Sequence, residues 1–389
     1  MTLVDFETQN WLSMLSSEDV SRAVDYTQGN HWISLVQLII TLAACFVISR
    51  LPLFRWAVER PLRHKHRQKL SAFSAALVFF AVLALMTFPF SVLFDWHRER
   101  VFDLSRQPFS DWASQWFLIS GLTTLFSAVL LMCIYVLIRR TGRFWWIWAS
   151  ALAASSLLLV TVLAPALIAP RLNTFTPAPP GDVLSAVTEL AASTGIPDDM
   201  IYIYDGSRQS DRFTANVSGL FGTSSIALSD TMFQQGADIA EIRAVVAHEL
   251  GHYVKHHVLL TLAFYSGLAG LVFFLTDRIF CAIAHRRTGG LNHMIQDPSS
   301  LPLMYAIFTA LLFLATPVTN TYSRLLENTA DVYALRLSDE PDGLASALIK
   351  TANYRAPSPH WLEEMLFYSH PSVERRIRRA MVWKIENRQ

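Results

Sequence analysis

Six long apolar stretches constrain the fold of this chain more than any other feature of its sequence. Hydrophobic residues make up 52% of the 389 residues, with 25 Phe and 11 Trp, a composition that favours a membrane protein. A helix needs about 20 apolar residues to cross a bilayer. Stretches of this kind lie at 32–49, 70–94, 116–138, 145–169, 258–281 and 301–318. We therefore expect an integral multi-pass membrane protein, mainly α-helical, with about six transmembrane helices.

These spans divide the chain into two parts. Residues 1–169 contain four of the spans and are expected to form an N-terminal membrane domain. Residues 170–389 contain the last two spans, flanked by two polar segments, 170–257 and 321–389. Because the last two spans form one membrane hairpin, the polar segments return to the same face. They are expected to fold together as a small α+β domain.

Local patterns in the polar segments predict their main elements. Residues 182–193 predict a helix, 200–204 a strand, and 212–229 two strands joined by a turn at Gly222. The sixth span is expected to continue as a helix into the second polar segment and to end at Pro341–Gly343. The small domain should therefore contain a short β-hairpin or sheet.

Charge and cysteine content exclude several classes of protein. The net charge of +1 lacks the strongly basic character that is typical of nucleic-acid binding, so no nucleic-acid partner is expected. Cys45, Cys133 and Cys281 all fall within spans, which excludes a disulfide framework and a cysteine-bound zinc. The bilayer itself is the expected partner of the apolar surface.

The segment His248–His252 has the form H-E-x-x-H, which on a helix is the zinc motif of a hydrolase. Two histidines four residues apart lie on one helical face, so both imidazoles can bind one ion. Glu249 is placed to take a proton from a zinc-bound water. Asp238 followed by Glu241 predicts the start of this helix and puts the motif in its interior. The helix is expected to run on into the fifth span.

A catalytic zinc needs a third protein ligand. The metzincin spacing is excluded, because Lys255 and Val258 stand where its Gly and third His would be. Glu327, in the pattern Glu327-x-x-x-Asp331, is the expected third ligand. The hairpin of the last two spans returns it beside the helix that holds the H-E-x-x-H motif, which we call the zinc helix. Asp331 lies on the same helical face and is placed to accept a hydrogen bond from a ligand imidazole or to pair with an Arg.

His256 and His257 also follow the motif closely, but we do not expect them to be ligands. His248, His252 and Glu327 already complete the set for one Zn²⁺ ion. Histidines where a helix enters the membrane are expected to keep their polar tips in water at the interface.

The chain resembles the membrane-integrated gluzincin proteases of the CAAX prenyl protease type 1 family. The resemblance depends on motifs that follow in the family's order along the chain: Pro89-Phe-Ser91, Glu99–Phe102, Ile168–Pro177, the H-E-x-x-H motif, Glu327-x-x-x-Asp331, Ser346–Lys350 and Tyr368-Ser-His-Pro371 with Arg376. Eukaryotic members have seven spans, against six here. The resemblance also implies a large chamber among the helices.

Further site residues are implied only by this resemblance. His370 would stabilise the tetrahedral intermediate, and Arg376 would pair with Asp331. The substrate would bind as an added strand beside an edge strand that corresponds to Thr214, Ala215, Asn216, Val217 and Gly219. Thr214 replaces the family's Asn, which leaves backbone pairing but not a side-chain contact as an expectation.

These features predict a membrane-embedded zinc metalloendopeptidase similar to CAAX prenyl proteases. Its substrate is expected to be a peptide or protein, with or without a prenyl group. The alternative is a non-catalytic zinc-containing membrane scaffold or chaperone in membrane-protein quality control, against which the intact Glu249 argues. A transporter is disfavoured, because the spans contain almost no ionisable residues.

The side of the membrane that holds the zinc domain stays open. Basic residues gather in the short loops opposite that domain, which by the positive-inside rule places it outside the cytoplasm. The resemblance implies a cytosolic domain instead.

Overall fold

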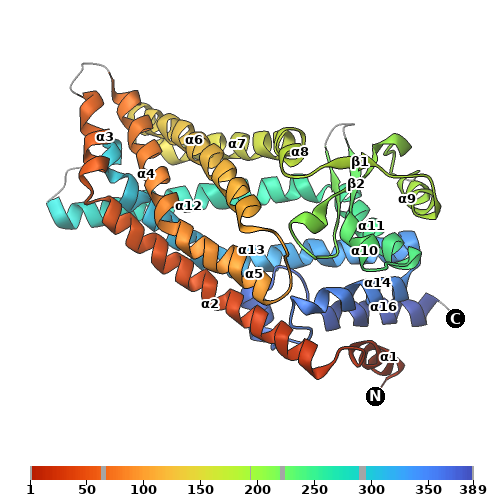
Figure 1. Cartoon of the computed structure of the whole chain (residues 1–389). Helices are drawn as coiled ribbons and strands as arrows, with labels where there is room; N and C mark the ends of the chain where they lie inside the picture. Colours follow the sequence, from red (N-terminus) through yellow and green to blue (C-terminus); the bar gives the residue numbers. More distant parts are fainter. Residues whose placement is uncertain (1, 63–66, 193, 220–223, 289–294, 388–389) are drawn as a thin grey trace.

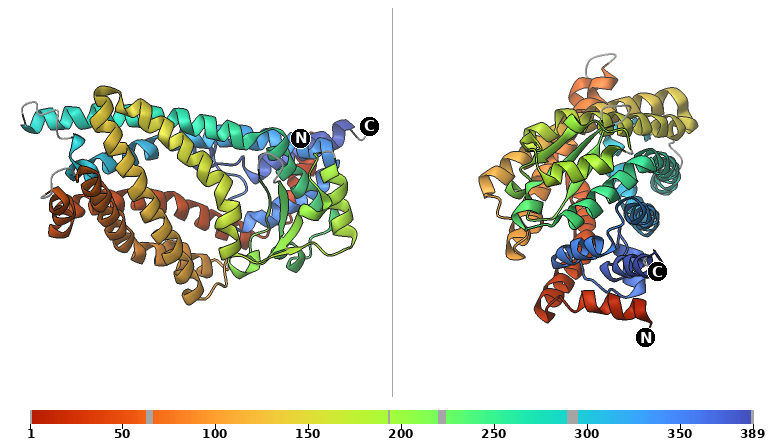
Figure 2. Two further views of the ribbon diagram at one scale, coloured as in Figure 1. Left: turned by 90° about the horizontal axis from the view of Figure 1, so that it is seen from above. Right: turned by 90° about the vertical axis from the view of Figure 1, so that its right-hand side faces the viewer.

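The structure is a computed structural model that describes residues 2–387, except 63–66, 193, 220–223 and 289–294. A bundle of long helices forms one part of the molecule, and a smaller mixed part holds the sheet (Figure 1). Both chain ends lie at the end of the molecule that holds the sheet (Figures 1 and 2). The turn predicted at Gly222 falls outside the described residues.

The predicted spans lie in long helices. These are α2 (Ser17–Ile48), α4 (Gln68–Ser91), α6 (Phe109–Thr141), α7 (Trp145–Leu167), α12 (His257–Thr288) and α13 (Leu301–Ser338). Among the described residues, five helical stretches are long and apolar enough to cross a membrane, and one of them, Phe109–Leu167, contains α6 and α7 with a short turn between them. Each of the six predicted spans therefore lies within such a stretch, to within two residues.

The helical bundle has its own apolar core and a partly open cavity. Phe79 on α4, Tyr135 on α6 and Trp145 on α7 are fully buried there. The short helix α3 (Pro52–Leu62) packs against α4. A cavity of about 480 Å³ lies between α4, α6, α12 and α13; its lining is mostly apolar, and most of its hydroxyl groups come from α6.

The sheet of the smaller part has four short strands. They are β1 (Phe175–Pro177), β2 (Ile201–Tyr204), β3 (Ala215–Ser218) and β4 (Ser225–Ser229), in the order β1-β2-β4-β3. β2 and β4 are parallel, and the other two pairs are antiparallel. β3 is therefore an edge strand. β1 was not predicted, because three exposed residues give no alternating pattern.

Helices cover this sheet and form a second core. They are α9 (Asp182–Ala192), α10 (Asp230–Gln234) and α11 (Ile239–Val254). Apolar residues from α9, β4 and α11 pack together, among them Val187, Leu228 and Val246, which are fully buried. α11 also packs against β3 and α13, which brings the zinc motif beside the edge strand.

The C-terminal segment forms α14 (Pro341–Lys350), α15 (Trp361–Phe367) and α16 (Val373–Asn387). The N-terminal helix α1 (Leu3–Leu12) packs against α16 and α14, so the first residues of the chain lie with the C-terminal part. Two one-turn helices, α5 (Arg98–Val101) and α8 (Ala169–Leu172), complete the described α-helices. The predicted division into residues 1–169 and 170–389 stays a prediction.

Two helix ends differ from the prediction. α11 does not run on into the fifth span: it ends at Val254, and His256 has a φ of 54°, which breaks the helix before α12 begins at His257. The second difference is the C-terminal end of α13. This helix stops at Ser338, and the next residue, Asp339, has a φ of 49°. Pro341 starts α14 rather than ending α13, because proline is favoured in the first turn of a helix.

Candidate metal centre

Helix α11 is fixed at its N-terminus by a capping box. Asp238 accepts a hydrogen bond from the backbone N–H of Glu241 at 2.7 Å, and the Glu241 carboxylate accepts one from the backbone N–H of Asp238 at 3.1 Å. Ser346 and Lys350 of α14 also donate to the buried Glu241 carboxylate, at 2.5 and 2.6 Å. The cap thus ties the start of the zinc helix to α14.

Gly251 allows α11 and α13 to approach each other closely. A Cβ atom at Gly251 would lie 3.1 Å from the Cα and the carbonyl oxygen of Ala330, both backbone atoms of α13. Backbone atoms cannot rotate away as a side chain can. Glycine in the motif therefore sets the separation of the two helices that present the candidate ligands.

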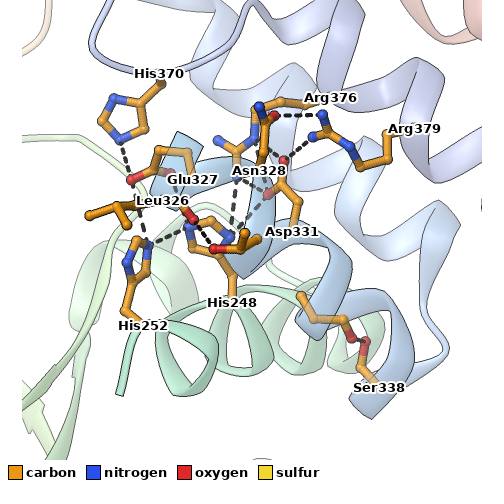
Figure 3. A network of polar contacts seen from close by, with 12 residues as sticks. His248, His252, Leu326, Glu327, Asn328, Asp331, Ser338, His370, Arg376 and Arg379 are labelled. Carbon is orange, nitrogen blue, oxygen red and sulfur yellow. Dashed lines mark hydrogen bonds and ion pairs between the residues drawn. The ribbon is translucent and has the colours of Figure 1, made fainter. Parts of the chain in front are cut away.

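Three donor groups from these helices converge (Figure 3). His248 Nε2 lies 3.1 Å from His252 Nε2 and 3.2 Å from Glu327 Oε2, and His252 Nε2 lies 3.5 Å from Glu327 Oε1. One ligand atom from each of the three residues lies within 4.8 Å of the others. The structure therefore brings together the three residues that the sequence predicted as ligands.

The chemistry of this group fits a zinc ion. Two imidazole nitrogens and a carboxylate are the His₂Glu set of catalytic zinc sites. Glu327 Oε2 is buried without a hydrogen-bond partner among the described residues, although it lies beside His248 Nε2. An unpartnered buried carboxylate oxygen is costly, and a cation between the three groups removes that cost.

A buried ion pair orients His248. Its Nδ1 lies 3.0 Å from Asp331 Oδ1, so an N–H at Nδ1 donates to the carboxylate and leaves the lone pair of Nε2 free for a metal. Arg376 binds Asp331 through Nε and an Nη atom, at 3.0 and 2.6 Å, and Arg379 donates at 2.9 Å. Asp331 thus makes both contacts that were considered for it, one to the imidazole and one to arginine.

His252 is oriented by His257. The Nδ1 atoms of the two rings lie 2.9 Å apart, and His257 Nε2 lies 3.0 Å from Thr329 Oγ1 on α13. Burial lowers the pKa of His252 to about 4, so its ring stays neutral. The expectation that His257 keeps its polar tip in water is wrong: the helix break at His256 turns His257 inward, where it is 4% exposed, while His256 is exposed.

Glu249 has the properties of a general base. Its side chain is half-buried and makes no hydrogen bond or ion pair with the described residues. Burial raises the pKa of its carboxyl to about 7, and the neighbouring Glu327 carboxylate adds to the shift. A group that titrates near neutral pH can both take and return a proton.

His370 reaches the same centre from the loop after α15. Its Nε2 lies 3.4 Å from Glu327 Oε1 (Figure 3). Its Nδ1 lies 3.0 Å from Ser369 Oγ. Burial, with the neighbouring Arg355 guanidinium, lowers the pKa of His370 to about 3. A neutral ring that accepts from Ser369 at Nδ1 carries its proton at Nε2, directed at the centre.

The predicted substrate-binding segment forms one of the two edges of the sheet. Ala215, Asn216 and Val217 lie in β3, which pairs only with β4 among the described strands. Thr214 precedes the strand, and its hydroxyl lies 2.9 Å from the Tyr204 hydroxyl. Gly219 follows it with a φ of 104°. The outer edge of β3 therefore has backbone groups available to an added strand.

Sequence reasoning missed three residues around this centre. The sequence indicates no role for His257 other than ligand, Arg379 lies one helical turn after Arg376, and Arg355 has no motif around it. The signal for His257 was its position five residues after a ligand, but its contact depends on a break in the helix. Arg379 repeats Arg376 at a spacing of three, which places both on one face of α16.

Family models match nearly all of the chain. The model described as "Peptidase family M48" matches residues 177–384. The model described as "CAAX prenyl protease N-terminal, five membrane helices" matches residues 9–174, where the described structure has four long helices.

Individual relatives agree with these matches. An uncharacterized metalloprotease of Bacillus subtilis, YhfN, is 29% identical over 78% of this chain and 72% of its own length. The CAAX prenyl protease 1 of Saccharomyces cerevisiae is 31% identical over 57% of this chain, which spans about half of that relative, 52%. The crystal structure of Ste24p from S. mikatae shares the fold, with a TM-score of 0.77 at 21% identity over 97% of this chain and 96% of that one.

Proposed function

The chain belongs to peptidase family M48, and on this premise we propose that it cleaves peptide bonds at one zinc ion bound by His248, His252 and Glu327. The family match makes it a metallopeptidase with several membrane helices. One observation carries the assignment of the ligands: three donor atoms converge within 4.8 Å beside an unpaired glutamate. A purely structural zinc site does not require an unpaired carboxylate such as that of Glu249.

The chain's own residues divide the work of hydrolysis. Zinc, when bound, lowers the pKa of a water molecule and polarises the scissile carbonyl. Glu249 takes the proton of the attacking water at its carboxylate and then gives it to the leaving amine. Its raised pKa supports both transfers near neutral pH.

His370 and Asp331 support this step in two different ways. The Nε2–H of His370 donates to the oxyanion that develops on the carbonyl oxygen, which the 3.4 Å distance from Nε2 to Glu327 supports. Asp331, held by Arg376, keeps the His248 ring in the orientation and tautomer that a ligand needs.

The substrate is held in an extended conformation by β3. A peptide that pairs with the outer edge of this strand, between Thr214 and Gly219, lies beside α11 and its zinc motif. Hydrogen bonds between backbones do not distinguish one substrate side chain from another, so other contacts supply the sequence specificity.

A variant of Glu249 tests the mechanism in the full-length protein reconstituted in vesicles. Glu249→Gln is expected to retain about one zinc per chain and to lose roughly 10²–10⁴-fold in kcat/KM on a fluorogenic peptide. Glu386→Gln, an exposed change at the end of α16, is the matched control and is expected to leave cleavage unchanged. A Glu249→Gln protein with full activity would contradict the assignment. Zinc retention in a wild-type protein that cleaves no peptide would instead favour the scaffold alternative.

The substrate class that we propose is the one that the related proteases carry in their name, a peptide with a C-terminal CAAX-type end. A farnesylated peptide and its unmodified twin should be compared at equal vesicle content. A higher kcat/KM for the farnesylated peptide is expected if the prenyl group contributes to binding. Equal values would assign recognition to the peptide alone.

A further inference from the structure

A polar pocket lies next to His370, away from the apolar cavity of the helical bundle. Its volume is about 330 Å³. Its lining comes from α2, from the segment before β3, and from the segments that flank α15; Thr214, Arg355 and His370 are among the residues that face it. The pocket thus borders both the start of β3 and the candidate metal centre.

Arg355 supplies an unpaired positive charge in this pocket. It is half-buried, and within the described residues it makes no hydrogen bond or ion pair. The second arginine of the pocket, Arg212, is already neutralised by Glu99 at 2.8 Å. His31, also in the lining, has its own carboxylate partner, Glu363, at 3.7 Å. An arginine without a counter-ion in a partly enclosed pocket is poised for an anionic ligand.

The guanidinium is held in place before any ligand arrives. The guanidinium carbon of Arg355 lies 5.4 Å from the centroid of the Tyr354 ring, and that of Arg212 lies 5.1 Å from the same centroid. The backbone is fixed as well, because the N–H of Ala356 donates to Thr27 Oγ1 on α2 at 2.9 Å. Preorganisation of this kind lowers the entropy cost of binding.

The direction of an added strand decides which end of a substrate reaches the pocket. A peptide that pairs antiparallel with β3, the commoner arrangement, runs from the Ser218 end of the strand to the Thr214 end. Its C-terminal part then enters the pocket, because Thr214 lines it. His370 lines this pocket and also lies beside Glu327, one of the candidate zinc ligands. This position is expected if the scissile bond of the substrate lies immediately before the pocket.

We propose that this pocket binds the part of the substrate that follows the scissile bond, and that Arg355 binds a carboxylate there. The proposal rests on the proposed function and adds a determinant of specificity to it. The carboxylate can come from a free C-terminus or from an Asp or Glu side chain, since both offer the two oxygens that a guanidinium binds. A free C-terminus within the pocket limits cleavage to sites a short distance from the end of a chain.

The test compares three peptides with one scissile sequence, on the full-length protein in vesicles. One has a free C-terminal acid, one a C-terminal amide, and one a C-terminal amide with an Asp inside the leaving fragment. The wild-type protein is expected to cleave the acid about 10- to 100-fold more efficiently, by kcat/KM, than the plain amide. Recovery of efficiency by the Asp peptide would assign the carboxylate to a side chain, and no recovery would assign it to the C-terminus.

Variants link this preference to Arg355. Arg355→Gln is expected to bring the acid-to-amide ratio close to one, and Arg355→Lys to keep part of the preference. Arg378→Gln, on a surface arginine that pairs with Asp5, is the control and should keep the wild-type ratio. Zinc content and melting temperature confirm that each variant is folded.

Two outcomes separate this inference from the proposed function. If the wild-type protein cleaves all three peptides with equal efficiency, or if Arg355→Gln keeps the full preference, the role of Arg355 is wrong while the peptidase stands. If the wild-type protein cleaves none of a broad set of peptides, the proposed function itself fails.

Discussion

The two ends of α13 show how differently one helix can be used. At its C-terminal end, Glu327 and Asp331 are buried among histidines and arginines at hydrogen-bond distances. At its N-terminal end, Met304, Tyr305 and Phe308 line a cavity of about 480 Å³ whose walls are mostly apolar. The first end is a network of specific partners, and the second is a space bounded by side chains of similar character.

The contrast indicates where single substitutions have large effects. In a buried polar network, removal of one partner leaves another charge or hydrogen-bonding group unpaired, and the cost is large. The wall of the cavity is mostly apolar, with a few hydrogen bonds such as that between the hydroxyls of Tyr135 and Ser300, so a changed side chain outside those pairs is tolerated. Variants of both ends of α13, compared by melting temperature and zinc affinity in detergent, test this contrast.

Loss of Arg376 should have the largest effect. Arg376→Met leaves the fully buried Asp331 with Arg379 and His248 as its remaining partners, and is expected to destabilise the protein by about 3–5 kcal/mol. Arg379→Met is the matched control, because Arg379 is more exposed, with 28% of its side chain accessible, and should cost less. Equal melting temperatures for the two variants would contradict the central role of the Arg376–Asp331 pair.

Loss of His257 should weaken zinc binding without unfolding the protein. His257→Phe removes the acceptor for the Nδ1–H of His252 and is expected to lower zinc affinity about 10- to 100-fold. His256→Asn, on the neighbouring exposed residue, is the control: Asn tolerates the positive φ at this position, so zinc affinity should be unchanged. Competition with a chelator of known affinity measures both, and an unchanged affinity for His257→Phe would remove its orienting role.

A methyl group at Gly251 should separate the two ligand helices. Gly251→Ala is expected to destabilise the protein by about 1–3 kcal/mol, because its Cβ would meet the backbone of Ala330 at 3.1 Å. Alanine is otherwise the better helix former, so stabilisation would show that the helices can move apart freely. Gly267→Ala on α12, where a Cβ meets nothing within 4 Å, is the matched control.

The smallest effect is expected at the cavity. Thr124→Val removes a hydroxyl group from the α6 wall while keeping its volume, and should change stability by no more than about 0.5 kcal/mol. A loss as large as that of Arg376→Met would mean that the cavity wall is also a specific polar network, and the contrast between the two ends of α13 would fail.

Much of this architecture could be predicted because it depends on local patterns. The apolar spans, the capping residues Asp238 and Glu241 and the spacing of His248 and His252 are all properties of short segments. Glu327 could be predicted as well, because the hairpin of the last two membrane helices brings it back beside the helix that holds His248 and His252.

The remaining features depend on contacts between distant segments or on backbone conformations that composition does not reveal. His257 turns inward because His256 adopts a positive φ, which is uncommon outside glycine. Arg355 reaches the pocket because Ala356 binds Thr27, a residue more than 300 positions earlier in the chain. The strand β1 joins the sheet through pairing with β2 rather than through its own three residues.

The most direct test of the account is the zinc content and zinc-edge X-ray absorption spectrum of the purified protein and of Glu327→Ala. The wild-type protein is expected to bind one zinc ion, with two imidazole nitrogens and carboxylate oxygen in its spectrum. The variant is expected to lose the ion under the same conditions while it keeps its helical content. A Glu327→Ala protein that retains one zinc ion with an unchanged spectrum would contradict the proposed centre.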